Sequence, residues 1–231
     1  MKPQKIISIF FIVMLLLVSC NNKILSSTRS ITNTNSEAAQ KKPYLILISF
    51  DGFRWDYVEK YNPPNLSSFI KNGVKAESLI PSFPTKTFPN HYTIATGLYP
   101  DKHGIIGNKF YDHTIDTLFN PKMADVGSFY RGSPIWVEAN KADIVTASYF
   151  FVGTEAKIKG VRPTYYCKFD NNVKNEGRIN QTLKWLNLNE KNRPHLITLY
   201  FGDLDKVGHK YGANADEKIK TFNIQVDEDF K

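Results

Sequence analysis

The sequence predicts an α/β domain built on a mostly parallel sheet, and three observations support this fold class. Two continuous apolar runs, residues 44–50 and 195–201, are rich in the residues typical of strands that are buried on both faces. Each run ends at acidic residues, as expected where a buried strand reaches a polar loop. Helical patterns lie between the two runs, and strands that alternate with helices are typical of α/β domains.

The elements between these runs are predicted from apolar spacing and from glycine stops. A short helix ends at Gly73 and a second helix ends at Gly97, because glycine readily adopts the left-handed conformation that closes a helix. In chain order, the predicted elements are a strand at 44–50, a helix at 65–72, a strand at 74–80, a helix at 88–96, a strand at 143–151, an amphipathic helix at 178–188 and a strand at 195–201. In such sheets, functional residues gather at the carboxyl ends of the strands.

The first 42 residues differ from the rest of the chain in charge. They hold six of the 30 Lys and Arg residues and one of the 22 acidic residues, and so carry most of the formal net charge of +8. The remaining basic residues are scattered and are not interleaved with aromatic residues. A nucleic-acid-binding face is therefore not expected.

Residues 1–19 resemble a bacterial lipoprotein signal peptide. Basic residues precede an apolar run from Ile6 to Val18, which is too short to span a bilayer but suits a signal-peptide core. The run ends in Leu-Val-Ser-Cys, which is similar to a lipobox. We expect Cys20 to be lipidated and to hold the protein on the bacterial cell envelope, at the periplasmic or the outer membrane. A plain secretory signal is the alternative.

Residues 20–42 are expected to be the lipidated cysteine followed by a flexible tether. They are rich in Ser, Thr and Asn and show no sustained apolar period. The folded domain is then expected to occupy residues 43–231.

Individual residues at strand ends and helix starts could carry chemistry. Asp205 and His209 lie four residues apart after a buried strand, so both would point the same way on a coiled backbone and could hold one metal ion. Asp51 follows the first strand, where it could equally cap a helix or a turn. Thr87 lies at a helix start, where an N-cap role is the simplest explanation.

Four segments together resemble the nucleotide pyrophosphatase/phosphodiesterase family of the alkaline phosphatase superfamily. They are LISFDGFRWDY, FPTKTFPNHYTIATGLYPDKHGIIGNKFYD, PIWVEA and LYFGDLDKVGHKYG, and the resemblance covers about residues 44–231. It implies an alkaline-phosphatase-like fold with helices on both faces of the sheet. It also implies hydrolysis of the phosphodiester or pyrophosphate bonds of nucleotides, with a nucleotide or another small phosphodiester as the substrate.

The resemblance further implies a two-zinc site with a threonine nucleophile. Thr87 matches the nucleophile, and Asn108 matches the amide that supports the transition-state oxygen. The implied metal ligands are Asp51 and Thr87 for one Zn²⁺ and Asp205 and His209 for the other. The implied substrate-binding residues are Phe88 and Tyr200, which match aromatic residues that flank a nucleotide base, together with Asn108.

Metal binding and helix geometry explain why this chemistry needs Thr87 where it is. A free threonine hydroxyl is a very weak acid, and a bound Zn²⁺ stabilises negative charge on an oxygen. The start of a helix adds free N–H groups and the positive end of the helix dipole, which favour a phosphate.

Three ligands of the family, an Asp-His pair and a later histidine, have no match in this sequence, which looks truncated at its carboxyl end. Because a catalytic zinc usually has three protein ligands, we expect weak zinc binding and little or no activity of the 231-residue chain by itself. A phosphomonoesterase or a lipid phosphodiesterase with the same metal site, and a non-catalytic remnant, are the alternatives.

Overall fold

The computed structural model describes residues 27–220. The signal peptide expected over residues 1–19 and the lipidation expected at Cys20 therefore lie outside the described residues. Within residues 27–220, no helix is long and apolar enough to cross a membrane.

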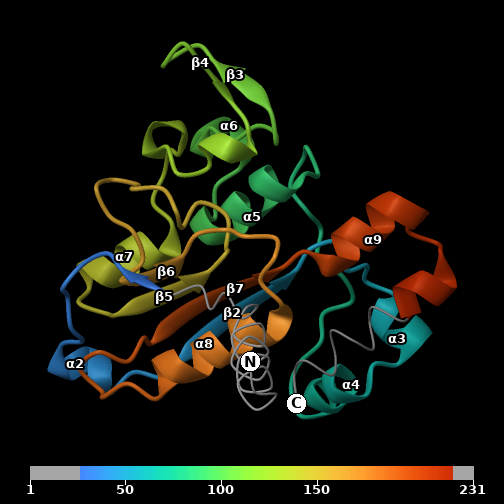
Figure 1. The fold of residues 1–231 in the computed structure, drawn as a ribbon, viewed down its shortest axis with the longest axis horizontal. Helices are drawn as coiled ribbons and strands as arrows, with labels where there is room; N and C mark the ends of the chain where they lie inside the picture. The colour runs from blue at the N-terminus through green and yellow to red at the C-terminus, as the bar shows by residue number, and fades with distance from the viewer. Residues whose placement is uncertain (1–26, 221–231) are drawn as a thin grey trace, which may run out of the picture.

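The described chain forms one five-stranded sheet, one two-stranded sheet and the helices that pack around them (Figure 1). The strands are β1 (Thr28–Arg29), β2 (Leu45–Phe50), β3 (Phe110–Asp112), β4 (Thr117–Phe119), β5 (Thr146–Tyr149), β6 (Tyr165–Cys167) and β7 (Leu196–Phe201). The helices are α2 (Glu37–Gln40), α3 (Tyr57–Tyr61), α4 (Pro64–Lys71), α5 (Thr87–Thr96), α6 (Pro100–His103), η1 (Pro121–Met123), η2 (Gly127–Phe129), α7 (Ile135–Lys141), α8 (Asn175–Leu186) and α9 (Asp203–Tyr211).

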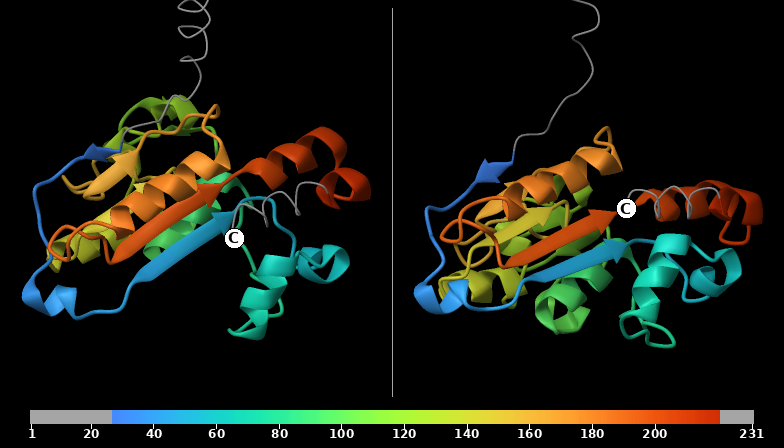
Figure 2. Two further views of the ribbon diagram at one scale, coloured as in Figure 1. Left: turned by 60° about the horizontal axis from the view of Figure 1, so that its bottom comes forward. Right: turned by 90° about the horizontal axis from the view of Figure 1, so that it is seen from below.

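The larger sheet confirms the predicted fold class. Its strand order is β1-β6-β5-β7-β2, and all neighbours are parallel except β1, which runs antiparallel to β6. Helix α8 covers one face, and α5 and α7 cover the other (Figure 2). The main core lies between these layers and includes the fully buried rings of Trp136, Trp185 and Phe119.

The two long parallel strands bring their carboxyl ends to one edge of the sheet. β2 and β7 pair in register from Leu45 opposite Leu196 to Phe50 opposite Phe201. The backbone N–H of Asp51 then donates to the carbonyl of Phe201, and α9 begins two residues after β7. The acidic residues that follow each strand therefore lie side by side.

Two features of this region differ from the sequence predictions. β7 is buried along its whole length, whereas Leu45, Ile46 and Ile48 of β2 are exposed, because β2 is the edge strand of the described sheet. The strand predicted over residues 74–80 is wrong: this segment is irregular and exposed, and within residues 27–220 it pairs with no strand.

The part of the expected tether that the structure describes packs against the domain. β1 pairs with β6, and the buried Asn35 donates from its side chain to the carbonyls of Glu190 and Arg193, each at 2.7 Å. The side-chain oxygen Oδ1 of Asn35 accepts from the backbone N–H of Val145 at 2.7 Å. Residues 27–42, which we call the amino-terminal strap, are thus bound to the sheet, because their Asn and Ser side chains satisfy buried backbone groups. Folded structure accordingly begins upstream of residue 43.

Candidate active site

The side chain of Thr87 lies at the carboxyl edge of the sheet and faces Asp51. Thr87 is the first residue of α5, and its Oγ1 donates to Oδ2 of Asp51 at 3.0 Å. The N-cap residue is Lys86, which makes no capping hydrogen bond through its side chain. The hydroxyl of Thr87 is therefore used for a contact with the strand end rather than as the helix cap that its position alone suggested.

Asp51 accepts a second hydrogen bond at the same oxygen. The hydroxyl of Tyr200, at the end of β7, donates to Oδ2 of Asp51 at 2.7 Å. Burial, followed by the charge of Asp51, raises the pKa of Tyr200, so the phenol keeps its proton and acts as a donor. Two hydroxyl donors from two elements thus orient one carboxylate oxygen.

Asp205 and His209 form the second group at this edge. They lie four residues apart on α9, and Nε2 of His209 is 3.4 Å from Oδ1 of Asp205. The backbone N–H of Asp205 donates to the carbonyl of Asp51 at 3.1 Å. Burial, with the nearby charge of Asp51 as the next cause, raises the pKa of Asp205. The structure therefore places two pairs at the same edge of the sheet, Asp51 with Thr87 and Asp205 with His209, and their role as metal ligands stays a prediction.

The chemistry of these donors fits a pair of zinc ions as far as the described residues extend. Carboxylate, hydroxyl and imidazole groups are all suitable donors to zinc or to the water around it. They occur as two pairs, Asp51 with Thr87 and Asp205 with His209. Within residues 27–220, no group of three or more His, Cys, Asp and Glu side chains is placed to hold a metal ion. Each pair thus offers two donor groups.

Asn108 lies next to the nucleophile candidate. Its Oδ1 accepts from the backbone N–H of Phe88 at 3.0 Å, in the first turn of α5. This bond commits the carbonyl end of the side-chain amide to the helix, which leaves the NH₂ end as a donor for another partner. The predicted proximity of Asn108 to Thr87 is confirmed, and its catalytic role stays a prediction.

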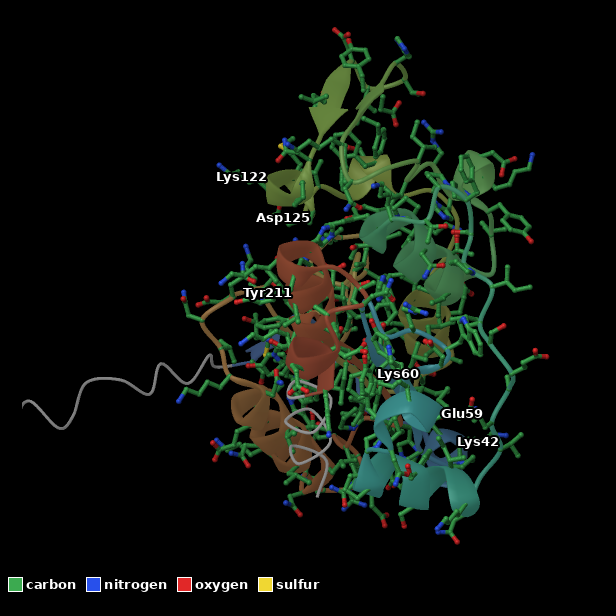
Figure 3. The ribbon with its side chains drawn as sticks, turned by 90° about the vertical axis from the view of Figure 1, so that its right-hand side faces the viewer. Lys42, Glu59, Lys60, Lys122, Asp125 and Tyr211 are labelled. Atoms are coloured by element: carbon green, nitrogen blue, oxygen red, sulfur yellow. The ribbon has the colours of Figure 1, made fainter. Side chains whose placement is uncertain are left out.

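A pocket of about 320 Å³ opens beside Thr87. Its lining is mainly aromatic and apolar, with a few charged side chains: Thr87, Phe88, Pro121, Lys122, Ala124, Asp125, Phe150, Phe151, Val152, Gly153, Glu155, Phe169 and Tyr200. Lys122 and Asp125 come from the segment after β4, seen above α9 in the view of Figure 3. Asp125 and Glu155 are the acidic residues of the lining, and burial raises the pKa of Glu155. Such a pocket suits a flat, mostly apolar ring.

The aromatic residues around this pocket differ in what they can offer a ligand. Phe88 lines the pocket as predicted. Tyr200 also lines it, but the residue is 9% exposed and its hydroxyl is bound to Asp51. Phe169, which sequence analysis missed, is 47% exposed in the same lining. An aromatic residue just after a short strand carries no distinctive spacing, so only its position in the fold identifies Phe169.

Gly52 permits the close approach of the two strand ends. It has a φ of +72°, and a Cβ built there would lie 2.6 Å from Cα of Asp205. We expect Gly52→Ala to lower the free energy of unfolding by about 2–4 kcal/mol, because it adds a backbone clash to the strain of a positive φ. Gly160→Ala is the matched control, since Gly160 has a φ of +81° with nothing within 4 Å of the added Cβ. Urea unfolding measures both, and equal losses would contradict the close-approach argument.

The fold and the site define an α/β protein with a candidate active site at the carboxyl edge of a parallel sheet. The chain belongs to the type I phosphodiesterase / nucleotide pyrophosphatase family, whose model matches residues 45–231. This is a family of metal-dependent hydrolases in the alkaline phosphatase superfamily.

Several characterised proteins are similar to this chain. Mouse (Mus musculus) ectonucleotide pyrophosphatase/phosphodiesterase family member 1 is 39% identical over 195 residues, which are 83% of this chain and 22% of that protein. Venom phosphodiesterase CdcPDE of Crotalus durissus collilineatus is 40% identical over 195 residues, again 83% of this chain and 24% of that protein. The chain thus spans less than a quarter of the length of these relatives.

Solved structures share the fold. Murine ectonucleotide pyrophosphatase/phosphodiesterase 5 superimposes with a TM-score of 0.76 at 31% identity, over 80% of this chain and 50% of that chain. An inactive threonine-to-alanine variant of the same murine protein, in complex with AMP, superimposes with a TM-score of 0.77 at 30% identity, over 81% of this chain and 50% of that chain.

Proposed function

We propose that this chain carries the nucleophile of an enzyme that hydrolyses phosphodiester or pyrophosphate bonds of nucleotides. The observation that carries the proposal is the hydrogen bond from Thr87 to Asp51 at the start of α5, beside an aromatic pocket. The similar solved protein that is inactive as a threonine-to-alanine variant and binds AMP supports both the nucleophile and the ligand class.

In the proposed reaction, Oγ1 of Thr87 attacks the phosphorus atom. The bond between Oγ1 and phosphorus forms, and the bond from phosphorus to the leaving alcohol or phosphate breaks. The hydroxyl proton of Thr87 passes to a solvent water, and the leaving group takes up a proton from solvent. Water then cleaves the threonine ester and releases a nucleoside monophosphate. Asp51 orients the attacking hydroxyl through their hydrogen bond, and Asn108 donates from its NH₂ group to the charge that develops on the phosphoryl oxygens.

Zinc belongs to this proposal as the expected cofactor. Asp51 and Thr87 would hold one ion, and Asp205 and His209 would hold the other. A bound zinc ion supplies a Lewis acid that stabilises negative charge on oxygen. The start of α5 contributes independently of metal, because its backbone N–H groups and dipole favour the negatively charged phosphoryl group.

The substrate is proposed to bind with its base in the pocket and its phosphate at Thr87. Phe88 and Phe169 offer ring faces for a base, and the pocket volume of about 320 Å³ suits one ring system. The protein is further proposed to act at the bacterial cell envelope, held by a lipid on Cys20. The sequence pattern at residues 17–20 supports that location.

A substrate panel tests the proposed function. The purified chain, with added Zn²⁺, is offered nitrophenyl esters of a nucleotide, of phosphate alone and of phosphocholine. Turnover is expected to be low, because each pair offers two of the usual three zinc ligands; within it, the nucleotide diester should be cleaved fastest, by about 10-fold or more in kcat/KM, because it alone brings a base to the pocket besides the nitrophenyl group that all three esters share. Preference for the phosphate monoester or for the choline ester would favour the alternatives. No cleavage of any ester, in assays continued for hours, would favour a non-catalytic chain.

A further inference from the structure

His91 is buried directly behind the candidate nucleophile and uses both ring nitrogens. The residue is 3% exposed and lies one turn after Thr87 on α5. Nδ1 lies 2.8 Å from the carbonyl oxygen of Thr87, and Nε2 lies 2.7 Å from Oγ of Ser49. A carbonyl can only accept, so Nδ1 donates its hydrogen to Thr87. In the neutral ring, Nε2 then accepts from the hydroxyl of Ser49.

These contacts join α5, β2 and β7, the elements that carry or precede Thr87, Asp51 and Tyr200. Ser49 lies on β2, two residues before Asp51, and is the register partner of Tyr200 on β7. The ring of His91 packs edge-on against Tyr200, with centroids 5.2 Å apart, and against Phe151 of the pocket lining at 5.5 Å. One buried imidazole therefore contacts the two strands and the helix that position the hydroxyl of Thr87.

The bond from His91 reaches the first turn of α5. Lys86, the N-cap, makes no capping hydrogen bond through its side chain; Oδ1 of Asn108 holds the N–H of Phe88 in this turn, and His91 holds the carbonyl of Thr87. Thr87 is in that turn. A lateral shift of its Oγ1 by about 1 Å would be enough to lower the rate of an in-line attack strongly.

We propose that His91, oriented by Ser49, is a positioning residue that fixes Thr87 for attack on phosphorus, which rests on the function proposed above. The bond from His91 to the Thr87 carbonyl, with the bond from Ser49 to the same ring, ties the first turn of α5 to β2. His91 does not touch the substrate in this proposal. It acts through the backbone of Thr87.

Ser49→Ala is the test, because it removes the hydroxyl that orients the ring and leaves the ring in place. Ser148→Ala is the matched control: it removes a buried hydroxyl that pairs with Thr198 at 2.7 Å between β5 and β7 and takes no part in the hydrogen bonds of His91. Three quantities are measured on the full chain: the tautomer of His91 by nitrogen NMR, the hydrogen exchange of amides in the first turns of α5, and kcat and KM for a nitrophenyl nucleotide ester. Urea unfolding of both variants reports any general loss of stability.

We expect the wild-type chain to hold His91 with its hydrogen on Nδ1. Ser49→Ala should raise amide exchange at the start of α5 by about 10-fold and lower kcat by about 10-fold, with KM within about twofold of the wild-type value. Ser148→Ala should change neither the amide exchange at the start of α5 nor kcat. Equal exchange in the two variants, or a hydrogen on Nε2, would overturn the positioning role. If Ser49→Ala alone raises the amide exchange and the chain shows no turnover, the proposed function is overturned. The ordering of Thr87 by His91 would still hold in that case.

Discussion

Thr87→Ala is expected to abolish the low cleavage of a nucleotide diester expected of this chain, down to the rate of the uncatalysed reaction. The variant removes the oxygen that attacks phosphorus, and the described site offers no other hydroxyl bound to Asp51 except the phenol of Tyr200. Loss of a nucleophile has the largest effect of any single change in an active site. Initial rates with a nitrophenyl nucleotide ester in excess Zn²⁺ measure the loss.

Two controls separate loss of the nucleophile from loss of the fold. Thr87→Ser keeps the hydroxyl and is expected to retain activity within about 10-fold of the wild-type rate. Thr85→Ala removes a neighbouring threonine whose hydroxyl only donates weakly to the carbonyl of Ser82, at 3.4 Å, and is expected to have no effect. Activity in Thr87→Ala similar to that in Thr85→Ala would contradict the assignment of Thr87 as the nucleophile.

Asp51→Asn is expected to lower kcat by about 100-fold and to shift the titration of Asp205. The amide keeps the shape of the carboxylate but loses the charge that strengthens the hydrogen bond from Thr87 and that would hold a cation. Because burial and then the charge of Asp51 raise the pKa of Asp205, removing that charge should lower the pKa of Asp205 toward its usual value. Carbon NMR of the carboxyl groups, with EDTA present, follows this shift without any need for turnover.

The same variant has an expected effect on stability as a function of pH. A carboxyl group whose pKa is raised in the folded state favours folding most below its unfolded pKa, and that contribution is lost as pH rises through the folded value. Wild-type protein should therefore lose stability above pH 3.8 through Asp205, and Asp51→Asn should lose less. Tyr200→Phe is the control, since it removes one hydrogen bond to Asp51 and keeps the charge. An unchanged titration of Asp205 in Asp51→Asn would contradict the coupling of the two acids.

Local patterns predicted the elements that carry the site. The buried run of β7, the amphipathic spacing of α8 and the Gly97 stop of α5 are properties of neighbouring residues, and the structure confirms each of them. The four-residue spacing of Asp205 and His209 predicted that both side chains point the same way. They do, because α9 is a regular helix.

Features that depend on distant residues could not be found in this way. The strand predicted at 74–80 has suitable residues but lacks a partner in residues 27–220, and the pairing of Thr28 with Tyr166 joins short segments with no period of their own. The bond of Tyr200 to Asp51 likewise exists because β7 and β2 are neighbours in the sheet. Sequence patterns therefore predicted the elements that carry the candidate residues, whereas the arrangement of the sheet determined the contacts of these residues.

The amino-terminal strap has a practical consequence for producing the protein. Removing residues 27–42 at the apparent domain boundary would uncover the backbone edge of β6 and leave the N–H of Val145 and the carbonyls of Glu190 and Arg193 without their partner Asn35. Unsatisfied groups at a bare strand edge favour association between molecules. Recombinant versions that start upstream of Ser27 should consequently stay soluble to higher concentrations than versions starting at Pro43.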